Sequence, residues 1–388
     1  MFEIDDVKGQ PARIKVVGVG GAGGNAINNM ISSNLQGVDF VAVNTDTQVL
    51  ESSLAPIKVQ IGASITRGLG AGADPQIGRQ SALEDRNALA EVLGGSDLVF
   101  ITAGMGGGTG TGASPVIAGI AKELGALTVA IVTRPFFFEG KPRAAKAEEG
   151  IKELKAHVDT LIVIPNDRIA LVVEKKVSFH KGFAATDEVL KQAIQGISDI
   201  ILTPGLINVD FADVRATMEG AGRAVMGVGS GKGEGAAVEA AKKAITNPLL
   251  EDSTIEGARG ILINITGGAE LSIGDVMEAA SIINDMAHEG AKITFGTVVN
   301  PDAEDEVKIT VIATGFDEKK EKVELPQVKK WAPVKEPFSY RGSERVLAKN
   351  LVPKNISFDS LGEGSDLIPY EDPLDVPTFL RNAPQRTM

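Results

Sequence analysis

Residues 104–112 contain six glycines and follow an apolar run, residues 97–103, that is typical of a buried strand. A helical pattern over residues 113–124 comes next. A strand that passes through glycines into a helix presents clustered backbone N–H groups and the positive end of a helix dipole, which together bind phosphate. The segment therefore predicts a phosphate-binding loop. It differs from the P-loop, because no Gly-Lys-[Ser/Thr] sequence ends it.

A second glycine-rich segment, residues 18–25, joins the first expected strand to the first expected helix. It matches the G-x-G-x-x-G pattern of dinucleotide-binding folds at Gly18, Gly20 and Gly23. Alone, this pattern fits an NAD-dependent Rossmann oxidoreductase and equally a tight turn that binds no ligand. Together with residues 104–112 at the end of another strand, it suits a chain of phosphates better than a dinucleotide.

Other polar residues fall at the ends of expected strands. Asn44 and Asp46 close one strand, where their side chains can reach ribose, phosphate or a metal-bound water. Residues 71–75 begin a helix and offer another anion-facing turn, near a γ-phosphate. Glu139 and Arg143 supply a carboxylate for sugar hydroxyls and a guanidinium for phosphate. Each one alone is more often a helix cap or a member of a surface pair, and it is their shared position at strand ends that favours a binding site.

A purine base requires paired donors and acceptors beside an apolar or aromatic surface. Asn166 ends the fifth expected strand, and Phe183 and Asp187 lie where a long helix begins. A carboxylate that accepts from N1–H and the exocyclic amine selects guanine over adenine, whose N1 is an acceptor. Asp187 is therefore a candidate for guanine recognition, and the alternative that it is an ordinary helix-start residue stays open.

Asn208, Asp210 and Asp213 form the last candidate group. The two carboxylates lie three residues apart on one face of a starting helix, where they can orient water or bind a cation. They can equally be helix N-terminal acids that complement the dipole, and the residues alone favour this second interpretation. They follow the long helix, so the chain has left the strand ends where the nucleotide loops lie. A pair at the opposite end could not act on its own subunit's nucleotide.

A parallel sheet must position these loops. From residue 13 to 164 short β-branched runs alternate with amphipathic stretches, which is typical of repeated βα units with helices on both faces of the sheet. Such sheets bind ligands beyond the carboxyl ends of their strands. We expect strands at residues 14–19, 38–44, 98–103, 127–133 and 161–165, and helices at 24–33, 75–93, 113–124 and 143–157.

A long helix, residues 186–202, leads to a smaller α+β block that extends to residue 316. We expect helices there at residues 211–219, 236–245 and 273–288, strands at 260–266, 292–299 and 306–314, and a strand with a glycine loop at 224–235. The run 229–233 looks like a P-loop, but no Ser or Thr follows Lys232. We interpret this run as a flexible loop.

Composition limits the classes of function. The 388 residues suffice for two domains, and 43% hydrophobic with 23% charged residues is typical of a globular protein. A net charge of −12 argues against general nucleic-acid binding, and the absence of cysteine excludes disulfides and thiolate metal sites and fits a reducing cytosol. No apolar run of membrane-spanning length occurs, and the acidic N-terminus does not resemble a secretory signal. We therefore expect no direct membrane insertion.

Residues after 317 change in character. The segment 317–370 is rich in Lys, Glu and Pro, which predicts a disordered linker. Residues 371–388 bring apolar side chains back, which favours a peptide that docks on a partner through Asp375, Pro377, Phe379, Leu380 and Arg381. The alternative is a tail that folds back on its own domain.

Taken together, these segments resemble the FtsZ family of bacterial tubulin-like cell-division GTPases. The run 106–112 reads as the family signature G-G-G-T-G-[ST]-G, and residues 43–48, 138–140 and 208–213 also match the family pattern. Residues 375–381 look like the family's C-terminal peptide, although Asn382 stands where a second arginine is often found. The resemblance covers residues 13–316 and the tail.

The resemblance implies a tubulin/FtsZ-like α/β fold. Its parts would be a flexible N-terminus (1–12), a Rossmann-like parallel-sheet GTP-binding domain (13–178), a central helix (179–203) and an α+β C-terminal activation domain (204–316), followed by the linker and the docking peptide. The residues implied to bind GTP or GDP are Gly20, Gly21, Ala22, Gly23, Gly24, Asn25, Asn44, Asp46, Ala71, Gly72, Ala73, Gly104, Gly106, Gly107, Gly108, Thr109, Gly110, Thr111, Glu139, Arg143, Asn166, Phe183 and Asp187.

The resemblance also implies the mechanism. Asn208, Asp210 and Asp213 of one subunit would position the water that attacks the GTP of the next subunit, with Mg²⁺ held mainly by phosphates and waters and with room for a monovalent cation. Such an interface is heterologous and grows an open head-to-tail filament. The tail would bind division proteins and membrane adaptors. The implied location is the cytoplasm, at the mid-cell division site beneath the inner membrane.

Overall fold

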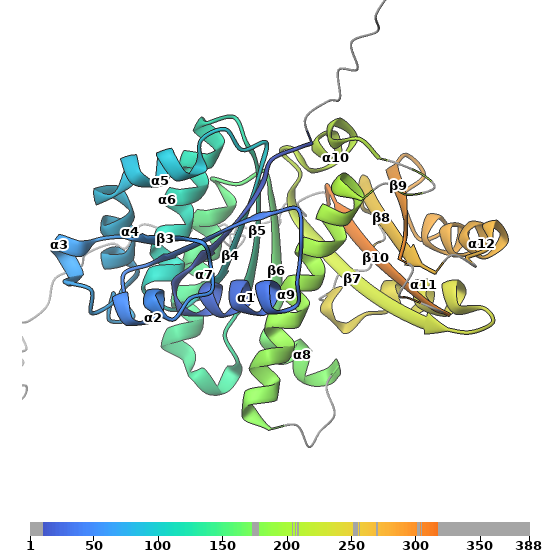
Figure 1. Ribbon diagram of the computed structural model, residues 1–388. Helices are drawn as coiled ribbons and strands as arrows, with labels where there is room; N and C mark the ends of the chain where they lie inside the picture. The colour runs from blue at the N-terminus through green and yellow to red at the C-terminus, as the bar shows by residue number, and fades with distance from the viewer. Residues whose placement is uncertain are drawn as a thin grey trace, which may run out of the picture. The chain divides into compact units, whose positions relative to one another are not determined.

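The computed structural model of the chain describes residues 11–316, apart from 173–177, 204, 206, 208, 251–254, 256, 269–270, 301–302 and 304. The described residues form one ten-stranded sheet with the strand order β3-β2-β1-β4-β5-β6-β7-β10-β8-β9 (Figure 1). Six neighbouring strands are parallel and four are mixed, so the sheet has two halves of different construction.

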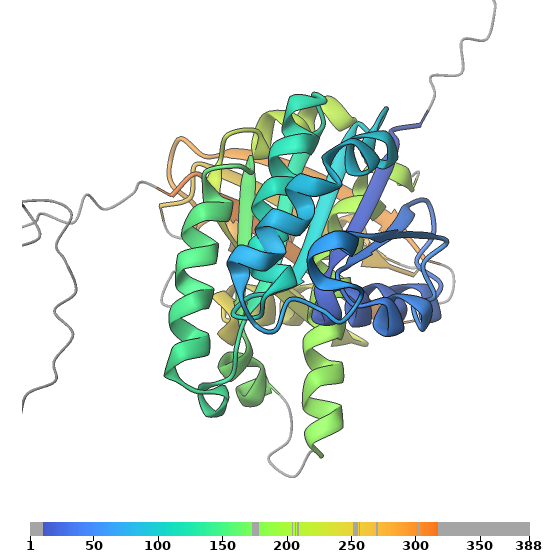
Figure 2. The same cartoon turned by 90° about the vertical axis from the view of Figure 1, so that its left-hand side faces the viewer.

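The parallel half is built from βα units. Its strands are β1 (Ile14–Val19), β2 (Asp39–Asn44), β3 (Ile57–Gln60), β4 (Leu98–Gly104), β5 (Leu127–Arg134) and β6 (Thr160–Pro165). Its helices are α1 (Gly20–Ser32), α2 (Thr47–Glu51), α3 (Ala63–Thr66), α4 (Pro75–Glu84), α5 (Arg86–Leu93), α6 (Thr109–Glu123), the short 3-10 helix η1 (Phe137–Glu139), α7 (Lys141–Lys155) and α8 (Asn166–Val172). Helices cover both faces of this half, as crossover connections between parallel strands require (Figures 1 and 2).

The mixed half contains β7 (Gly222–Lys232), β8 (Gly260–Gly267), β9 (Lys292–Val299) and β10 (Glu306–Thr314). Its helical elements are α10 (Phe211–Met218), α11 (Ala236–Ile245), η2 (Pro248–Leu250) and α12 (Ile273–Asn284). Strand β10 pairs antiparallel with β7 and β8, while β8 and β9 are parallel. The halves join where β6 pairs with β7 over only three residue pairs, from Thr160↔Gly222 to Ile162↔Ala224.

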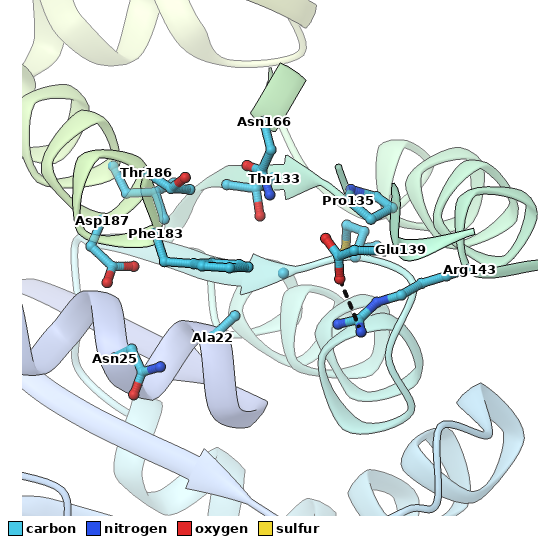
Figure 3. A pocket seen from close by; sticks show the side chains of 13 residues that line it. Ala22, Asn25, Thr133, Pro135, Glu139, Arg143, Asn166, Phe183, Thr186 and Asp187 are labelled. Atoms are coloured by element: carbon cyan, nitrogen blue, oxygen red, sulfur yellow. Dashed lines mark ion pairs between the residues drawn. The ribbon is translucent and has the colours of Figure 1, made fainter. Parts of the chain in front are cut away.

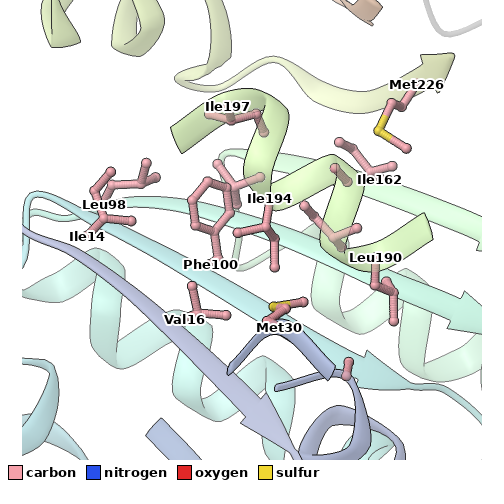
Figure 4. Close-up of a cluster of buried hydrophobic side chains, with 14 of the residues drawn as sticks. Ile14, Val16, Met30, Leu98, Phe100, Ile162, Leu190, Ile194, Ile197 and Met226 are labelled. Atoms are coloured by element: carbon pink, nitrogen blue, oxygen red, sulfur yellow. The ribbon is translucent and has the colours of Figure 1, made fainter. Parts of the chain in front are cut away.

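Helix α9 (Phe179–Leu202) connects the two halves through the core. Its 24 residues correspond to about 36 Å of helix. Leu190, Ile194 and Ile197 on α9 pack in one buried cluster with Phe100 of β4 and Met226 of β7 (Figure 4). Because this cluster takes side chains from both halves of the sheet, α9 holds the halves in a common core.

Two helices begin earlier than the sequence predicted. Helix α1 begins at Gly20 rather than residue 24, and α6 begins at Thr109 rather than residue 113. Glycine has low helix propensity, which favoured a loop at both places. Close approach explains the difference, because a Cβ on Gly110 would lie 2.8 Å from the Gly104 carbonyl oxygen. These glycines therefore form first helical turns, whose N–H groups have no partner inside the helix.

The prediction of a flexible loop at residues 229–233 was wrong, because β7 continues to Lys232. Three alternate glycines of β7 face α11, and a Cβ on any of them would strike a carbonyl oxygen of that helix. The pairs are Gly227 with Ala244, Gly229 with Ala240 and Gly231 with Ala236. Glycines two apart on a strand and alanines four apart on a helix both repeat at about 6–7 Å. The alternating glycines thus allow an alanine-rich helix to lie directly on the strand.

Other differences are smaller. The expected helix at 75–93 is divided at Asp85 into α4 and α5, where the Asp85 carboxylate accepts a hydrogen bond from the Gly62 N–H at 2.7 Å. The long helix begins at Phe179 rather than at residue 186. Strand β3 and the short helices α2, α3 and α8 had no distinct signal in the sequence. The expected strands of the parallel half agree with β1, β2, β4, β5 and β6 to within about one residue.

Candidate functional site

Three glycine-containing segments meet at the carboxyl ends of the parallel strands. A Cβ on Gly20 would lie 3.0 Å from the Gly110 nitrogen, so the first turn of α1 touches the first turn of α6. A Cβ on Gly108 would lie 2.8 Å from the Ala71 Cβ and 2.9 Å from the Asp74 nitrogen. The loops that the sequence predicted separately are therefore in contact at one place.

The segment of residues 71–73 presents three consecutive N–H groups. Gly72 and Ala73 have φ values of +57° and +60°. Within the described residues, none of the N–H groups of Ala71, Gly72 and Ala73 donates a hydrogen bond to the protein. Successive amides in left-handed turns form anion-binding concavities, so this loop has the geometry of a phosphate site.

Open space lies beside the glycine segments, on the sides where they do not contact one another. A Cβ placed on Gly21, Gly24 or Gly107 would have nothing within 4 Å. Space therefore remains beside both helix N-termini, where the α1 and α6 dipoles favour negative charge. The volume next to the loops suits a polyphosphate.

A pocket continues from the glycine segments toward α9 (Figure 3). Eight predicted residues line it: Ala22, Asn25, Gly104, Glu139, Arg143, Asn166, Phe183 and Asp187. Five further residues, which had not been predicted, also line it: Met105, Thr133, Pro135, Thr186 and Leu190. These are apolar residues or threonines, and no local pattern distinguishes such residues from ordinary core positions.

One end of the pocket has polar groups without protein partners. The Oδ1 atom of Asn166 is buried and accepts no hydrogen bond from the described residues. Burial raises the pKa of Asp187 from 3.8 to about 6. Asp187 and Asn25 lie together at this end, and the Phe183 ring extends across the pocket (Figure 3). A flat ligand that supplies hydrogen-bond donors would satisfy both groups.

The other end carries an ion pair. An oxygen of the Glu139 carboxylate lies 3.0 Å from the Arg143 guanidinium, and its second oxygen accepts from the Phe136 N–H at 2.8 Å. Glu139 is largely buried, whereas the Arg143 side chain is half exposed. The carboxylate is thus held rigidly, while the guanidinium is accessible to an anionic ligand.

The side chains of Asn44 and Asp46 accept hydrogen bonds from backbone nitrogens of the loop that these residues begin. The Asn44 Oδ1 accepts from the backbone nitrogens of Thr45 and Asp46 at 2.8 and 3.2 Å. The Asp46 carboxylate caps α2 by accepting from Gln48 and Val49. Thr45 shares a 2.7 Å side-chain hydrogen bond with Thr109, which ties this loop to the start of α6. Neither Asn44 nor Asp46 lines the pocket described above.

The acids near α10 lie at the opposite edge of the sheet. Arg215 on α10 donates to the carbonyl oxygens of Asp97 and Gly125, which precede β4 and β5. Figure 1 shows α8 and α10 at opposite ends of α9. From Asp187 to the end of α9 the helix rises about 22 Å. Asp210 and Asp213 are therefore remote from the pocket of their own chain.

Asp210 is the N-cap of α10, since its carboxylate accepts from the Asp213 N–H at 2.8 Å. Asp213 is exposed and lies 3.8 Å from the Lys292 ammonium nitrogen. Asp210 is thus a helix N-terminal acid with a capping hydrogen bond, and both carboxylates are exposed. Asn208 lies outside the described residues.

Comparison with known protein families decides between the alternatives. The family model described as "Tubulin/FtsZ family, GTPase domain" matches residues 13–174, and the one described as "FtsZ family, C-terminal domain" matches residues 222–317. The chain is also 48% identical to the cell division protein FtsZ of Pseudomonas aeruginosa, over 98% of this chain and 99% of that protein. The chain belongs to the FtsZ family.

Solved structures agree with this membership. An empty FtsZ dimer from M. jannaschii superposes with a TM-score of 0.75 at 43% identity, over 78% of this chain and 88% of that one. CetZ2 from Haloferax volcanii, solved as a GTPγS-bound protofilament, gives a TM-score of 0.68 at 22% identity, over 80% of this chain and 95% of that one. The second likeness shows the fold alone. The family GTPase domain binds GTP and GDP, and the comparisons give no support to the oxidoreductase alternative.

No group of three or more His, Asp or Glu side chains that could hold a metal ion occurs among the residues that the structure describes. In the same part of the chain, no helix is long and apolar enough to cross a membrane. The predicted docking residues Asp375, Pro377, Phe379, Leu380 and Arg381 lie outside the described residues.

Proposed function

We propose that the chain is a self-assembling GTPase of cell division whose active site is completed by a second copy. One observation carries the proposal. The pocket and the phosphate loops lie at the carboxyl edge of the parallel sheet, whereas Asp210 and Asp213 lie at its amino edge, near Asp97 and Gly125. A single chain cannot bring the two edges together, but stacked copies can.

The nucleotide lies along the pocket. Its phosphates face the N–H groups of residues 71–73 and of the first turns of α1 and α6. The ribose lies near Glu139, and Arg143 faces the phosphates. Guanine lies beside Phe183, where the Asp187 carboxylate accepts from N1–H and the exocyclic amine, and Asn166 supplies the buried Oδ1 described above.

Hydrolysis occurs where two subunits meet. The exposed carboxylates of Asp210 and Asp213, with Asn208, orient and polarise the water that attacks the γ-phosphate of the neighbouring subunit. An interface between one edge of a chain and the opposite edge of the next is heterologous, so it propagates as an open filament. GTP favours the contact, and hydrolysis weakens it. The M. jannaschii relative was solved as a dimer, which supports self-association.

Mg²⁺, when bound, would be held mainly by phosphate oxygens and waters. The described residues around the loops offer backbone N–H groups and few carboxylates, and this donor set fits the phosphates rather than a metal cage. When bound, the ion neutralises negative charge on the transferring phosphoryl group. A monovalent cation is compatible with the same arrangement.

Cell division is the setting of this activity, as the name of the Pseudomonas aeruginosa relative supports. The filament assembles in the cytoplasm at the mid-cell site beneath the inner membrane. The C-terminal peptide, residues 371–388, binds division proteins and membrane adaptors. The parts of the chain keep the boundaries given above for the GTP-binding domain, the central helix and the C-terminal domain.

The concentration dependence of hydrolysis tests the proposal. GTPase activity per molecule should rise steeply with protein concentration, because isolated subunits lack the acids that complete the site. Purified protein is assayed for phosphate release over a wide concentration range. A specific activity that stays flat in a monomeric protein would contradict an active site shared between copies.

A further inference from the structure

The loop of residues 70–74 has the least ordinary backbone near the nucleotide pocket. Gly70, Gly72 and Ala73 have φ values of +86°, +57° and +60°. Glycine adopts such angles readily, but a residue with a Cβ in the left-handed region costs about 1–2 kcal/mol. Since strained residues persist only where their surroundings hold them, Ala73 requires a specific restraint.

Lys146 of α7 supplies that restraint. Its ammonium nitrogen donates a 2.7 Å hydrogen bond to the Ala73 carbonyl oxygen. The bond joins residues that are 73 positions apart in the sequence. A hydrogen bond from an ammonium group to a carbonyl is stronger than a neutral one, so it can offset much of the strain at Ala73.

Helix α7 is itself fixed beside the glycine run. Ala147 and Leu154 are fully buried, which anchors the face of α7 next to Lys146. A Cβ on Gly150 would lie 2.9 Å from the Met105 Cε, and it would also strike the Thr111 side chain. Thr111 in turn accepts from the Gly106 N–H at 2.8 Å. Lys146 therefore links a helix that packs on the 104–112 segment to the 70–74 loop.

We propose that Lys146 is a positioning residue for the terminal phosphate of the nucleotide. It holds the Ala73 carbonyl so that the free N–H groups of residues 71–73 converge on one point. This inference rests on the proposed function, in which those N–H groups face the γ-phosphate. GDP lacks that phosphate, so the hydrogen bond of Lys146 contributes to GTP binding more than to GDP binding.

Equilibrium binding of GTP and GDP to the full chain tests the inference. Lys146→Met keeps most of the length of the side chain and removes the ammonium group, and it should weaken GTP binding about tenfold with less than about threefold effect on GDP. Lys146→Arg, which can still donate to Ala73, should recover most of the GTP affinity. Lys152→Met, an exposed position on the same helix, is the matched control and should bind both nucleotides as the wild type does.

Hydrolysis kinetics add a second readout. Lys146→Met should raise KM for GTP while kcat at saturation changes little, because the lysine does not touch the attacking water. Equal weakening of GTP and GDP, or no change in either, would overturn the inference. If the wild type itself binds neither nucleotide, the proposed function fails, and this result is distinct from a failure confined to Lys146.

A second substitution separates positioning from charge. Ala73→Gly removes the Cβ strain, so in the Lys146→Met background it should restore part of the lost GTP affinity. If Ala73→Gly restores nothing while Lys146→Arg restores the affinity fully, the lysine acts on the phosphate through its charge, and the positioning role is wrong. Thermal melting of each variant checks that the fold is retained.

Discussion

The two edges of the parallel sheet differ in how completely their polar groups are satisfied. At the carboxyl edge, the N–H groups of residues 71–73 and the Oδ1 of Asn166 have no partner among the described residues, and burial raises the pKa of Asp187 to about 6. At the amino edge, Asp210 caps α10 and Asp213 is exposed near Lys292. The first edge is built to receive a ligand, whereas the second is complete in itself and presents carboxylates outward.

Under the proposed function, this difference explains why one chain carries both parts of a reaction that it does not perform alone. The buried Oδ1 of Asn166 costs free energy until a ligand pairs with it, and the free N–H groups of residues 71–73 can donate to an anion, so the carboxyl edge favours ligand binding. Exposed acids cost little, so the amino edge is available to a neighbour without destabilising the free subunit. Substitutions that change one edge at a time separate the contributions of the two edges.

The largest effect is expected at the amino edge. Asp210→Asn preserves the helix cap, because Asn caps as well as Asp, but it removes the charge. GTP hydrolysis should fall about 100-fold or more, with unchanged GTP affinity and melting temperature. Glu239→Gln, which changes an exposed acid in the first turn of α11, is the control and should leave activity intact. A large loss of nucleotide affinity in Asp210→Asn would place this acid in the binding pocket instead.

A smaller effect is expected from Asp187 at the carboxyl edge. Guanine recognition needs the ionised carboxylate, so GTP affinity should fall as the pH drops through about 6, by at most about tenfold for each further pH unit. Asp187→Asn should weaken GTP binding about tenfold or more and abolish this pH dependence. Isothermal titration from pH 5 to 8 measures both. A wild-type affinity that is flat over this range would contradict the assignment.

The same pKa predicts an opposite trend for the stability of the protein without nucleotide. The folded pKa of Asp187 lies above its ordinary value of 3.8, so the folded state favours the protonated group. This contribution is present below pH 3.8 and is lost as the pH rises through about 6. Nucleotide binding thus gains from ionisation while the empty fold loses from it, as expected for a group placed for its ligand.

The smallest effects distinguish two neighbouring glycines. Gly107→Ala has open space around its Cβ, so it should keep the melting temperature and weaken nucleotide binding several-fold by entering the phosphate volume. Gly108→Ala would press on Ala71 and Asp74, so it should lower stability by about 1–3 kcal/mol. Melting curves and nucleotide titrations compare the pair. Equal destabilisation by both would show that the space beside Gly107 is not a ligand volume.

The sequence predicted the parallel sheet and most of the pocket because these depend on local signals. β-branched runs mark β1, β2, β4, β5 and β6, and glycines followed by helical patterns mark the phosphate loops. The helix starts at Gly20 and Thr109 were missed, because glycine propensity is overridden there by close backbone contacts. The end of β7, residues 229–232, was interpreted as a loop because of its glycines, which in the structure allow α11 to pack on the strand.

Contacts between segments that are far apart in the sequence could not be predicted, because no sequence pattern marks them. Lys146 and Ala73 are separated by 73 positions, and a lysine within a charged helix looks like a solvated residue. Thr133 and Thr186 line the pocket but resemble ordinary strand and helix residues. Their places become visible only when the sheet brings β5 and α9 together.

The central claim is that the two edges act across different copies of the chain, and mixing variants tests it most directly. Asp210→Asn binds GTP but lacks a working amino edge, while Asp187→Asn keeps that edge and binds GTP weakly. At a GTP concentration that loads only the first variant, the mixture should hydrolyse GTP faster than the sum of the two proteins assayed alone. A mixture whose rate equals that sum would contradict an active site shared between subunits.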